Sequence, residues 1–141
     1  MIKPIKYKDD VFGYIISYKK KIGSNFLTHP SLPNQIGSII HKKNHEIKPH
    51  IHFRNIRKIE YTSEVLIILK GKIRVDLYNN KKKYLFSKIV KKGEILLLIK
   101  GAHGFKALSD IELIEVKQGP YNKTKDKILF DLDISKKIKI K

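Results

Sequence analysis

Histidines and a glutamate recur along the chain in an order that suits metal binding or proton transfer. His50 and His52 are one residue apart, Glu64 opens the apolar run at 64–69, and His103 follows two small residues. Side chains two apart in a β-strand point to the same face, so His50 and His52 are expected to project together. Because one strand cannot enclose an ion, the remaining ligands must come from neighbouring strands, and Glu64 and His103 are available for that.

This set of side chains predicts one divalent transition metal bound by His50, His52, Glu64 and His103. Three imidazoles and one carboxylate with open positions suit Fe(II), Mn(II), Ni(II) or Zn(II), and the residues do not choose among them. The chain has no cysteine, which excludes thiolate ligands and disulfides. Two mechanisms follow: a Lewis-acid metal with a nearby histidine, glutamate or tyrosine moving a proton, or an Fe(II) site that binds dioxygen.

The strongly basic composition does not by itself indicate a nucleic-acid partner. The formal net charge is +18, but only three of the 31 basic residues are arginines, the side chain that phosphate and base recognition favours. The lysines are spread over the whole chain and fall mostly between apolar segments. We therefore expect solvated turns. A polyanionic partner stays open as an alternative, and a phosphorylated small-molecule substrate fits the charge equally well.

Short β-type segments separated by turn residues predict an all-β domain. A chain of 141 residues is long enough for one domain. No apolar run is long enough for a membrane span and the first residues lack the pattern of a signal peptide, so we expect a cytoplasmic protein. The predicted strands cover 12–18, 37–41, 49–53, 64–69, 72–78, 84–90, 94–99 and 111–117.

Three connecting segments carry predictions of their own. Residues 64–69 and 72–78 are predicted to form a hairpin that turns at Lys70-Gly71. Residues 29–34 are predicted to be a turn because of their prolines. In the tail, 126–134 is expected to be a short helix or an arm crossing to a second subunit, and 135–141 a frayed or edge-pairing end.

Arranged in this order, the motifs resemble those of the cupin superfamily. The first motif corresponds to Gly37, His50-Ile51-His52, Glu64 and Gly71, and the second to Gly93, Gly101 and His103. The similarity covers about residues 37–105. The chain departs from the family in the eleven residues between His52 and Glu64, which imply an inserted loop over 54–63, and in the single residue between Gly101 and His103. Because of these departures, Glu60 competes with Glu64 as the carboxylate ligand.

The resemblance implies a single domain over 1–141. Its fold would be a cupin-type double-stranded β-helix, or jelly-roll barrel, with a C-terminal extension at 119–141. It also implies a metal-dependent isomerase, epimerase or lyase acting on a sugar or sugar nucleotide, and a homodimer. The chain is similar as well to cupin ketoisomerases of surface-polysaccharide pathways, in which the paired histidines act as acid and base without metal. An Fe(II)-dependent dioxygenase and a non-catalytic saccharide-binding module remain alternatives.

The remaining site residues are expected around the mouth of the barrel. His50, His52 and Tyr61 are the candidate catalytic residues. Candidate substrate-binding residues are Arg54, Arg57 and Lys117.

Overall fold

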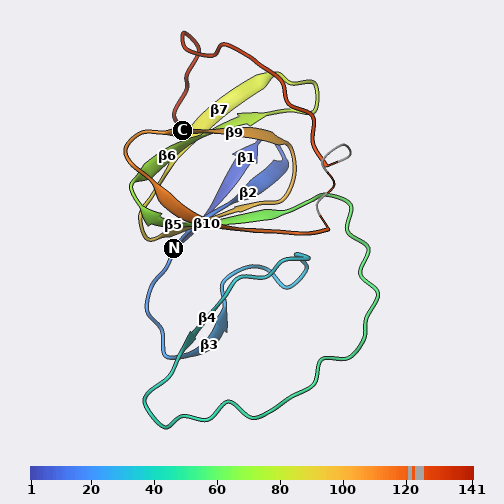
Figure 1. The fold of residues 1–141 in the computed structure, drawn as a ribbon, viewed down its shortest axis with the longest axis vertical. Coiled ribbons are helices and arrows are strands. Elements are labelled where there is room, and N and C mark those ends of the chain that lie inside the picture. The colour runs from blue at the N-terminus through green and yellow to red at the C-terminus, as the bar shows by residue number, and fades with distance from the viewer. Residues whose placement is uncertain (121, 123–125) are drawn as a thin grey trace.

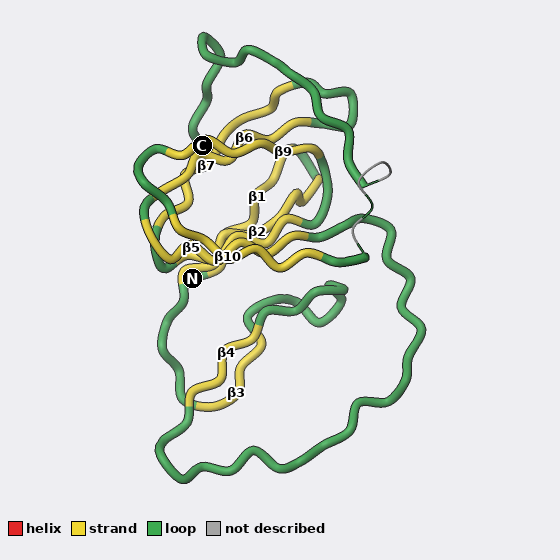
Figure 2. Tube along the Cα trace, viewed as in Figure 1, coloured by secondary structure: helices red, strands yellow, loops and turns green. Residues whose placement is uncertain are grey.

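The chain is all-β in a computed structural model that describes residues 1–120, 122 and 126–141. Figure 2 shows only strands and loops among these residues. The strands are β1 (Ile2–Tyr7), β2 (Asp10–Ser17), β3 (Gly23–Phe26), β4 (Gly37–Ile40), β5 (Glu64–Lys70), β6 (Lys72–Tyr78), β7 (Tyr84–Lys91), β8 (Glu94–Leu98), β9 (Ala102–Ala107) and β10 (Glu112–Lys117). The described residues hold no helix that could cross a membrane.

Two antiparallel sheets face each other and enclose the core. The larger sheet has the order β1-β2-β8-β5-β10 and the smaller one the order β7-β6-β9, while β3 and β4 form a separate two-stranded sheet. Figure 1 shows the two larger sheets opposite one another, with β3 and β4 beyond the five-stranded sheet. The core draws on both sheets, for example Leu66 and Leu96 on one side and Val75 and Phe86 on the other, all at most 2% exposed. This packing of two apolar inner faces stabilises the sandwich.

The connection at Gly71 passes from one sheet to the other, so the predicted hairpin between residues 64–69 and 72–78 is wrong. β5 pairs with β8 and β10, whereas β6 pairs with β7 and β9. Gly71 has a φ of +74°, and a Cβ added there would lie 2.0 Å from the carbonyl oxygen of Asp110. Glycine is needed because both the backbone conformation and the close approach exclude a side chain. The sequence could not separate the two cases, because β5 and β6 show the same alternation of apolar inner residues whether they form a hairpin or a corner between two sheets.

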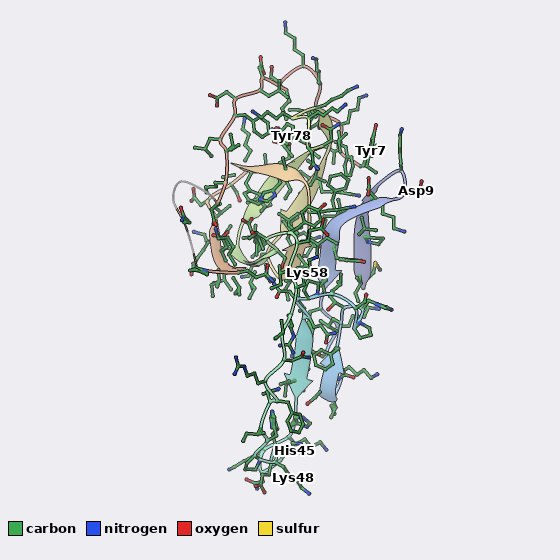
Figure 3. All side chains as sticks on the ribbon, turned by 90° about the vertical axis from the view of Figure 1, so that its right-hand side faces the viewer. Tyr7, Asp9, His45, Lys48, Lys58 and Tyr78 are labelled. Carbon is green, nitrogen blue, oxygen red and sulfur yellow. The ribbon has the colours of Figure 1, made fainter. Side chains whose placement is uncertain are left out.

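Residues 49–53, predicted to be a strand, lie in a long connection without regular structure between β4 and β5. Their apolar members are open to solvent, with Ile51 84% and Phe53 90% exposed. Figure 3 shows His45 and Lys48 of the same connection far from the two main sheets. Alternation of side chains sets which face a residue would occupy, but a strand forms only where a neighbour pairs with its backbone.

Three strands, β1, β3 and β9, were not predicted from the sequence, and the turn at 29–34 is confirmed as a segment without strands. β1 lies at the edge of the five-stranded sheet and contributes Ile5, which is 0% exposed. Lysines and Pro4 obscure its pattern, yet an edge strand tolerates both because one side of it faces solvent. β3 is short and pairs only with β4.

The C-terminal tail returns to the edge of β7. The Ser87 N–H donates to the Lys139 carbonyl at 2.7 Å, and the Lys141 N–H donates to the Ser87 carbonyl at 3.0 Å. Ser87 and Ile140 form a parallel bridge. The prediction of an edge-pairing end at 135–141 is therefore confirmed, whereas a helix at 126–134 is not formed.

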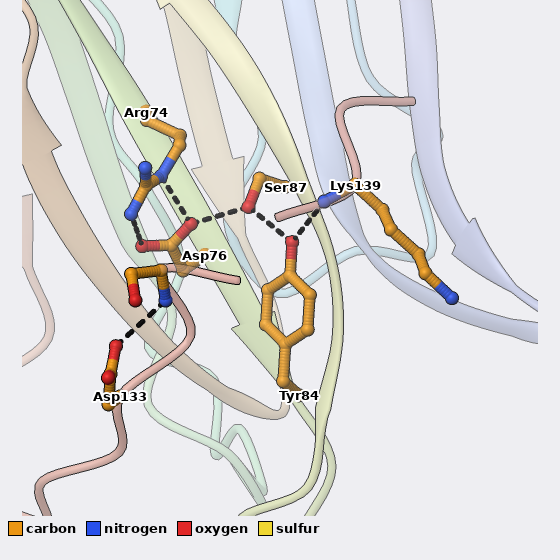
Figure 4. A network of polar contacts seen from close by, with 7 residues as sticks. Arg74, Asp76, Tyr84, Ser87, Asp133 and Lys139 are labelled. Carbon is orange, nitrogen blue, oxygen red and sulfur yellow. Dashed lines mark hydrogen bonds and ion pairs between the residues drawn. The ribbon is translucent and has the colours of Figure 1, made fainter. Parts of the chain in front are cut away.

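A buried polar network fixes the tail to the smaller sheet (Figure 4). Asp76, 6% exposed, accepts hydrogen bonds from Arg74 at 2.7 and 2.9 Å and from the Ser87 hydroxyl at 2.5 Å. The Tyr84 hydroxyl lies 2.7 Å from Ser87 Oγ and accepts the Lys139 N–H at 2.9 Å. Hydrogen bonding to Asp76 raises the pKa of Arg74, against the effect of burial. A buried charge satisfied in this way supports the position of every group bonded to it.

Candidate active site

Glu64 and His103 meet across the interior from opposite sheets. Glu64 begins β5 in the five-stranded sheet, and His103 is the second residue of β9 in the three-stranded sheet. His103 Nε2 lies 2.9 Å from Glu64 Oε2, and the two side chains are 23% and 18% exposed. The pair is thus shielded enough for a strong interaction and still partly open to a ligand.

The carboxyl group of Glu64 is held in its charged form. Its pKa is lowered, first by the hydrogen bond from His103, against the opposing effect of burial, and further by electrostatic interaction with His103 and Lys117. Lys117 lies opposite Glu64 in the pairing of β10 with β5 and forms an ion pair with Asp126. An ionised carboxylate can only accept, so Nε2 of His103 carries a proton and donates it to Glu64.

The other ring nitrogen of His103 is unsatisfied. Nδ1 is buried and has no hydrogen-bond partner among the described residues. A buried polar atom left unpaired costs about 1–3 kcal/mol. Such atoms are rare in folded proteins and call for a functional explanation, such as a ligand that supplies the missing partner. The Phe105 ring is next to His103, with centroids 5.2 Å apart, and is 45% exposed.

A cavity of about 420 Å³ opens close to the start of β9. Its wall includes Tyr61, Lys81, Lys100 and Gly101. Lys100 Nζ is paired with Asp10 at 2.5 Å, also on the wall. Gly101 is two residues from His103, so their Cα atoms are within about 7 Å along the chain. The cavity combines cationic and aromatic side chains close in the chain to His103, and neither Glu64 nor His103 is part of its wall.

A polar clamp holds the beginning of β5 against the end of β10. Ser63 is 1% exposed, and its N–H donates to Gln118 Oε1 at 3.1 Å. Asn34 Nδ2 donates to Ser63 Oγ at 2.6 Å. These bonds fix the backbone just before Glu64. The sequence did not predict the clamp or the cavity residues Asp10, Lys81 and Lys100. The polar turn at 79–83 was the one local signal for any of them. The other groups are distant in sequence and are brought together by the fold.

His50 and His52 do not reach the Glu64–His103 pair. Both are exposed, their ring centroids are 5.0 Å apart, and His50 Nδ1 lies 3.0 Å from the Lys48 carbonyl. The described residues contain no group of three or more histidine, aspartate or glutamate side chains able to hold a metal ion. As arranged, the four expected ligands do not form a metal centre.

The other expected site residues lie in several separate places. Tyr61 lines the cavity near His103, and Lys117 lies beside Glu64. Arg57 lines a separate cavity of about 570 Å³ together with the proline-rich turn at 30–33. Arg54 and Glu60 are exposed in the connection that precedes β5.

Comparison of the chain with protein-family models, with curated proteins and with solved structures found no match.

Proposed function

We propose that the protein is an acid–base enzyme of the isomerase, epimerase or lyase class that acts on a sugar or a sugar nucleotide. The observation that carries the proposal is the Glu64–His103 pair, in which an ionised carboxylate orients a histidine whose second nitrogen is unsatisfied. This arrangement favours proton transfer, because the carboxylate fixes the tautomer of the imidazole and stabilises the imidazolium that forms.

The proposed step is removal of a proton from a substrate carbon next to a carbonyl group. Nδ1 of His103 accepts the proton, the C–H bonding electrons move toward the carbonyl, and the carbonyl oxygen gains the negative charge. Return of the proton to a different atom or face gives the isomer or epimer. Nδ1 is buried in the free protein, so substrate binding must uncover it.

The substrate class is proposed from the cavity and from the resemblance to carbohydrate cupins. Lys81 brings positive charge to the cavity wall, where Lys100 is paired with Asp10, and this charge suits a phosphate group or the developing oxyanion. Tyr61 adds an aromatic ring and a hydroxyl group to the same wall, and both groups are common in sugar binding sites.

Proton exchange in D₂O tests this function without knowledge of the final product. The purified protein is incubated with a panel of keto sugars and nucleoside diphosphate sugars, and loss of the signal of the proton next to the carbonyl is followed by NMR. Wild type is expected to exchange at least one panel member, and His103→Asn to be slower by about 10²–10⁴-fold, the usual contribution of a general base. The control His45→Asn changes an exposed histidine far from the cavity and is expected to keep full activity. Equal exchange by His103→Asn and wild type contradicts the proposal.

A metal-dependent form of the same chemistry is the second candidate. The observation that favours it is the free edge of β9, which among the described strands pairs only with β6, directly beside His103. If residues 49–53 add to that edge as a strand, His50 and His52 approach His103, and the four expected ligands come together. Elemental analysis of protein purified without added metal tests this: stoichiometric metal that is lost in His50→Ala/His52→Ala supports it, and equal metal in both proteins contradicts it.

A further inference from the structure

The outer face of the five-stranded sheet is apolar where β10 lies and is left uncovered there. On β10, Ile114 and Val116 pair with Ile67 and Val65 of β5 and belong to the face opposite the core residue Leu66. Ile114 is 49% and Val116 is 53% exposed. In an antiparallel sheet with one solvated face, the outward positions are normally polar. The apolar outer positions of β10 thus form an exposed surface that is suited to contact with another element.

The same outer face is covered over β2 and β8. Ile16 is 1% and Leu97 is 0% exposed, although neither belongs to the core cluster between the sheets. Leu97 pairs with Val65, which links this covered region to the exposed region on β10. The apolar surface therefore continues from a buried part at the centre of the sheet to an open part at its edge.

A second uncovered apolar surface lies on the β3–β4 hairpin. Ile22, Phe26 and Ile39 are 68%, 75% and 65% exposed. Figure 1 places this hairpin on the outer side of the five-stranded sheet, yet the exposures show that the two surfaces do not cover each other within one copy. A two-stranded sheet with both faces in water is marginal by itself and gains stability when it packs on another surface.

Charge makes the two surfaces complementary. Three of the 13 acidic residues of the chain, Asp110, Glu112 and Glu115, are on β10 or just before it. The hairpin is flanked by lysines at 19–21 and at 42–43. Glu115 pairs with Leu66 and so faces away from Ile114 and Val116, and Glu112 pairs with Lys70. These carboxylates therefore border the apolar surface, where in a chain of net charge +18 they can meet the lysines that flank the hairpin of a second copy.

The apolar area is in the range that a dimer requires. Full burial of one such side chain removes roughly 60–120 Å² of apolar surface from water. The five side chains Ile22, Phe26, Ile39, Ile114 and Val116 are about half to three-quarters exposed and supply about 300 Å² per copy. A standard interface of about 800 Å² per partner is a little over half apolar, so these residues make up most of its apolar part.

We infer that the protein forms a symmetric homodimer in which the β3–β4 hairpin of each copy packs on the outer face of the other copy at β10. Each copy gives and receives the same contact, as twofold symmetry requires. The tail is not the crossing element, because residues 139–141 pair with β7 of their own chain.

Sedimentation of the full chain over a concentration series tests the dimer and locates its interface. Wild type is expected to be a dimer, and Ile114→Lys/Val116→Lys a monomer. The matched control Ile128→Lys/Leu129→Lys adds the same charge at two tail residues that are 80% and 84% exposed, and is expected to stay dimeric. A monomeric wild type overturns the inference, as does a sheet variant that remains dimeric.

Phe26→Ser tests the interface from the hairpin side, where a change cannot disturb the core. It is expected to weaken the dimer at least tenfold in Kd while circular dichroism and the melting temperature of the monomer are kept. Disulfide formation tests the contact between residue 26 of one copy and residue 116 of the other, because the chain has no cysteine of its own. The Phe26→Cys and Val116→Cys proteins are mixed and oxidised, and the mixture is expected to give a covalent dimer in higher yield than either protein alone. No increase on mixing overturns the proposed contact.

Discussion

Replacing Glu64 by glutamine tests the electrostatic reasoning about the central pair. The substitution keeps the shape of the side chain and an acceptor oxygen but removes the charge that the His103 N–H faces at 2.9 Å. A hydrogen bond to a charged group contributes about 1.5–3 kcal/mol. Because both side chains are about one-fifth exposed, solvent screens the interaction, and we expect a loss of about 1–2 kcal/mol at pH 7.

The pH dependence of that loss has a definite sign. The pKa of Glu64 is lowered in the folded protein, so the carboxylate stabilises the fold at pH values above its unfolded pKa. This contribution falls as the pH decreases through the folded pKa, where the carboxylate becomes protonated. Wild type and Glu64→Gln are therefore expected to differ in the free energy of unfolding at pH 7 and to converge below the folded pKa.

Urea denaturation followed by circular dichroism across this pH range, in the presence of a chelator, measures the difference. Glu115→Gln is the control, because Glu115 is an exposed carboxylate on the adjacent strand, and its removal is expected to change the free energy by less than about 0.5 kcal/mol. A difference between wild type and Glu64→Gln that is the same at both ends of the pH range refutes the assignment of an ionised, stabilising carboxylate.

Two further predictions concern the fold. Gly71→Ala is expected to lower the free energy of unfolding by more than about 2 kcal/mol, because the new Cβ meets the Asp110 carbonyl. Gly93→Ala is the control: Gly93 has a φ of +83°, but an added Cβ has nothing within 4 Å, so alanine costs only about 1–2 kcal/mol of backbone strain there. Equal losses in chemical denaturation would contradict the reading of Gly71. Phe86→Ala removes a side chain that is 0% exposed and is expected to cost about 3–5 kcal/mol, seen as a large drop in melting temperature; a drop of only a few degrees would place Phe86 outside the core.

Strands were predicted best where apolar alternation is strong and the strand contributes side chains to the core. The segments at 72–78, 84–90 and 94–99 correspond closely to β6, β7 and β8. Their order in the sheets was not predictable in the same way, because the pattern of β5 and β6 is compatible with one sheet or two. The two arrangements are distinguished by contacts between residues distant in sequence: the pairing of β5 with β8 and β10, the pairing of β6 with β7 and β9, and the close approach of Gly71 to Asp110.

For the candidate site, the sequence indicated which residue types could act but not which of them meet. Glu64 and His103 come into contact because each is part of a strand with a buried neighbour that fixes its position, Leu98 for Glu64 and Leu77 for His103. His50 and His52 have the right spacing, but their backbone has no neighbouring strand, so spacing alone did not place them. The unsatisfied nitrogen of His103 is a property of the packing and leaves no trace in the sequence.

The order of strands in the five-stranded sheet governs how the chain reaches its native state. β2 lies beside β8 and β5 lies beside β10, so segments separated by dozens of residues must find each other before the sheet exists. Such distant pairing makes folding slow, on the order of milliseconds to seconds, compared with microseconds for proteins rich in local contacts. During that interval the apolar edges of β5 and β8 are open to other chains, so we expect refolding yield to decline as protein concentration rises.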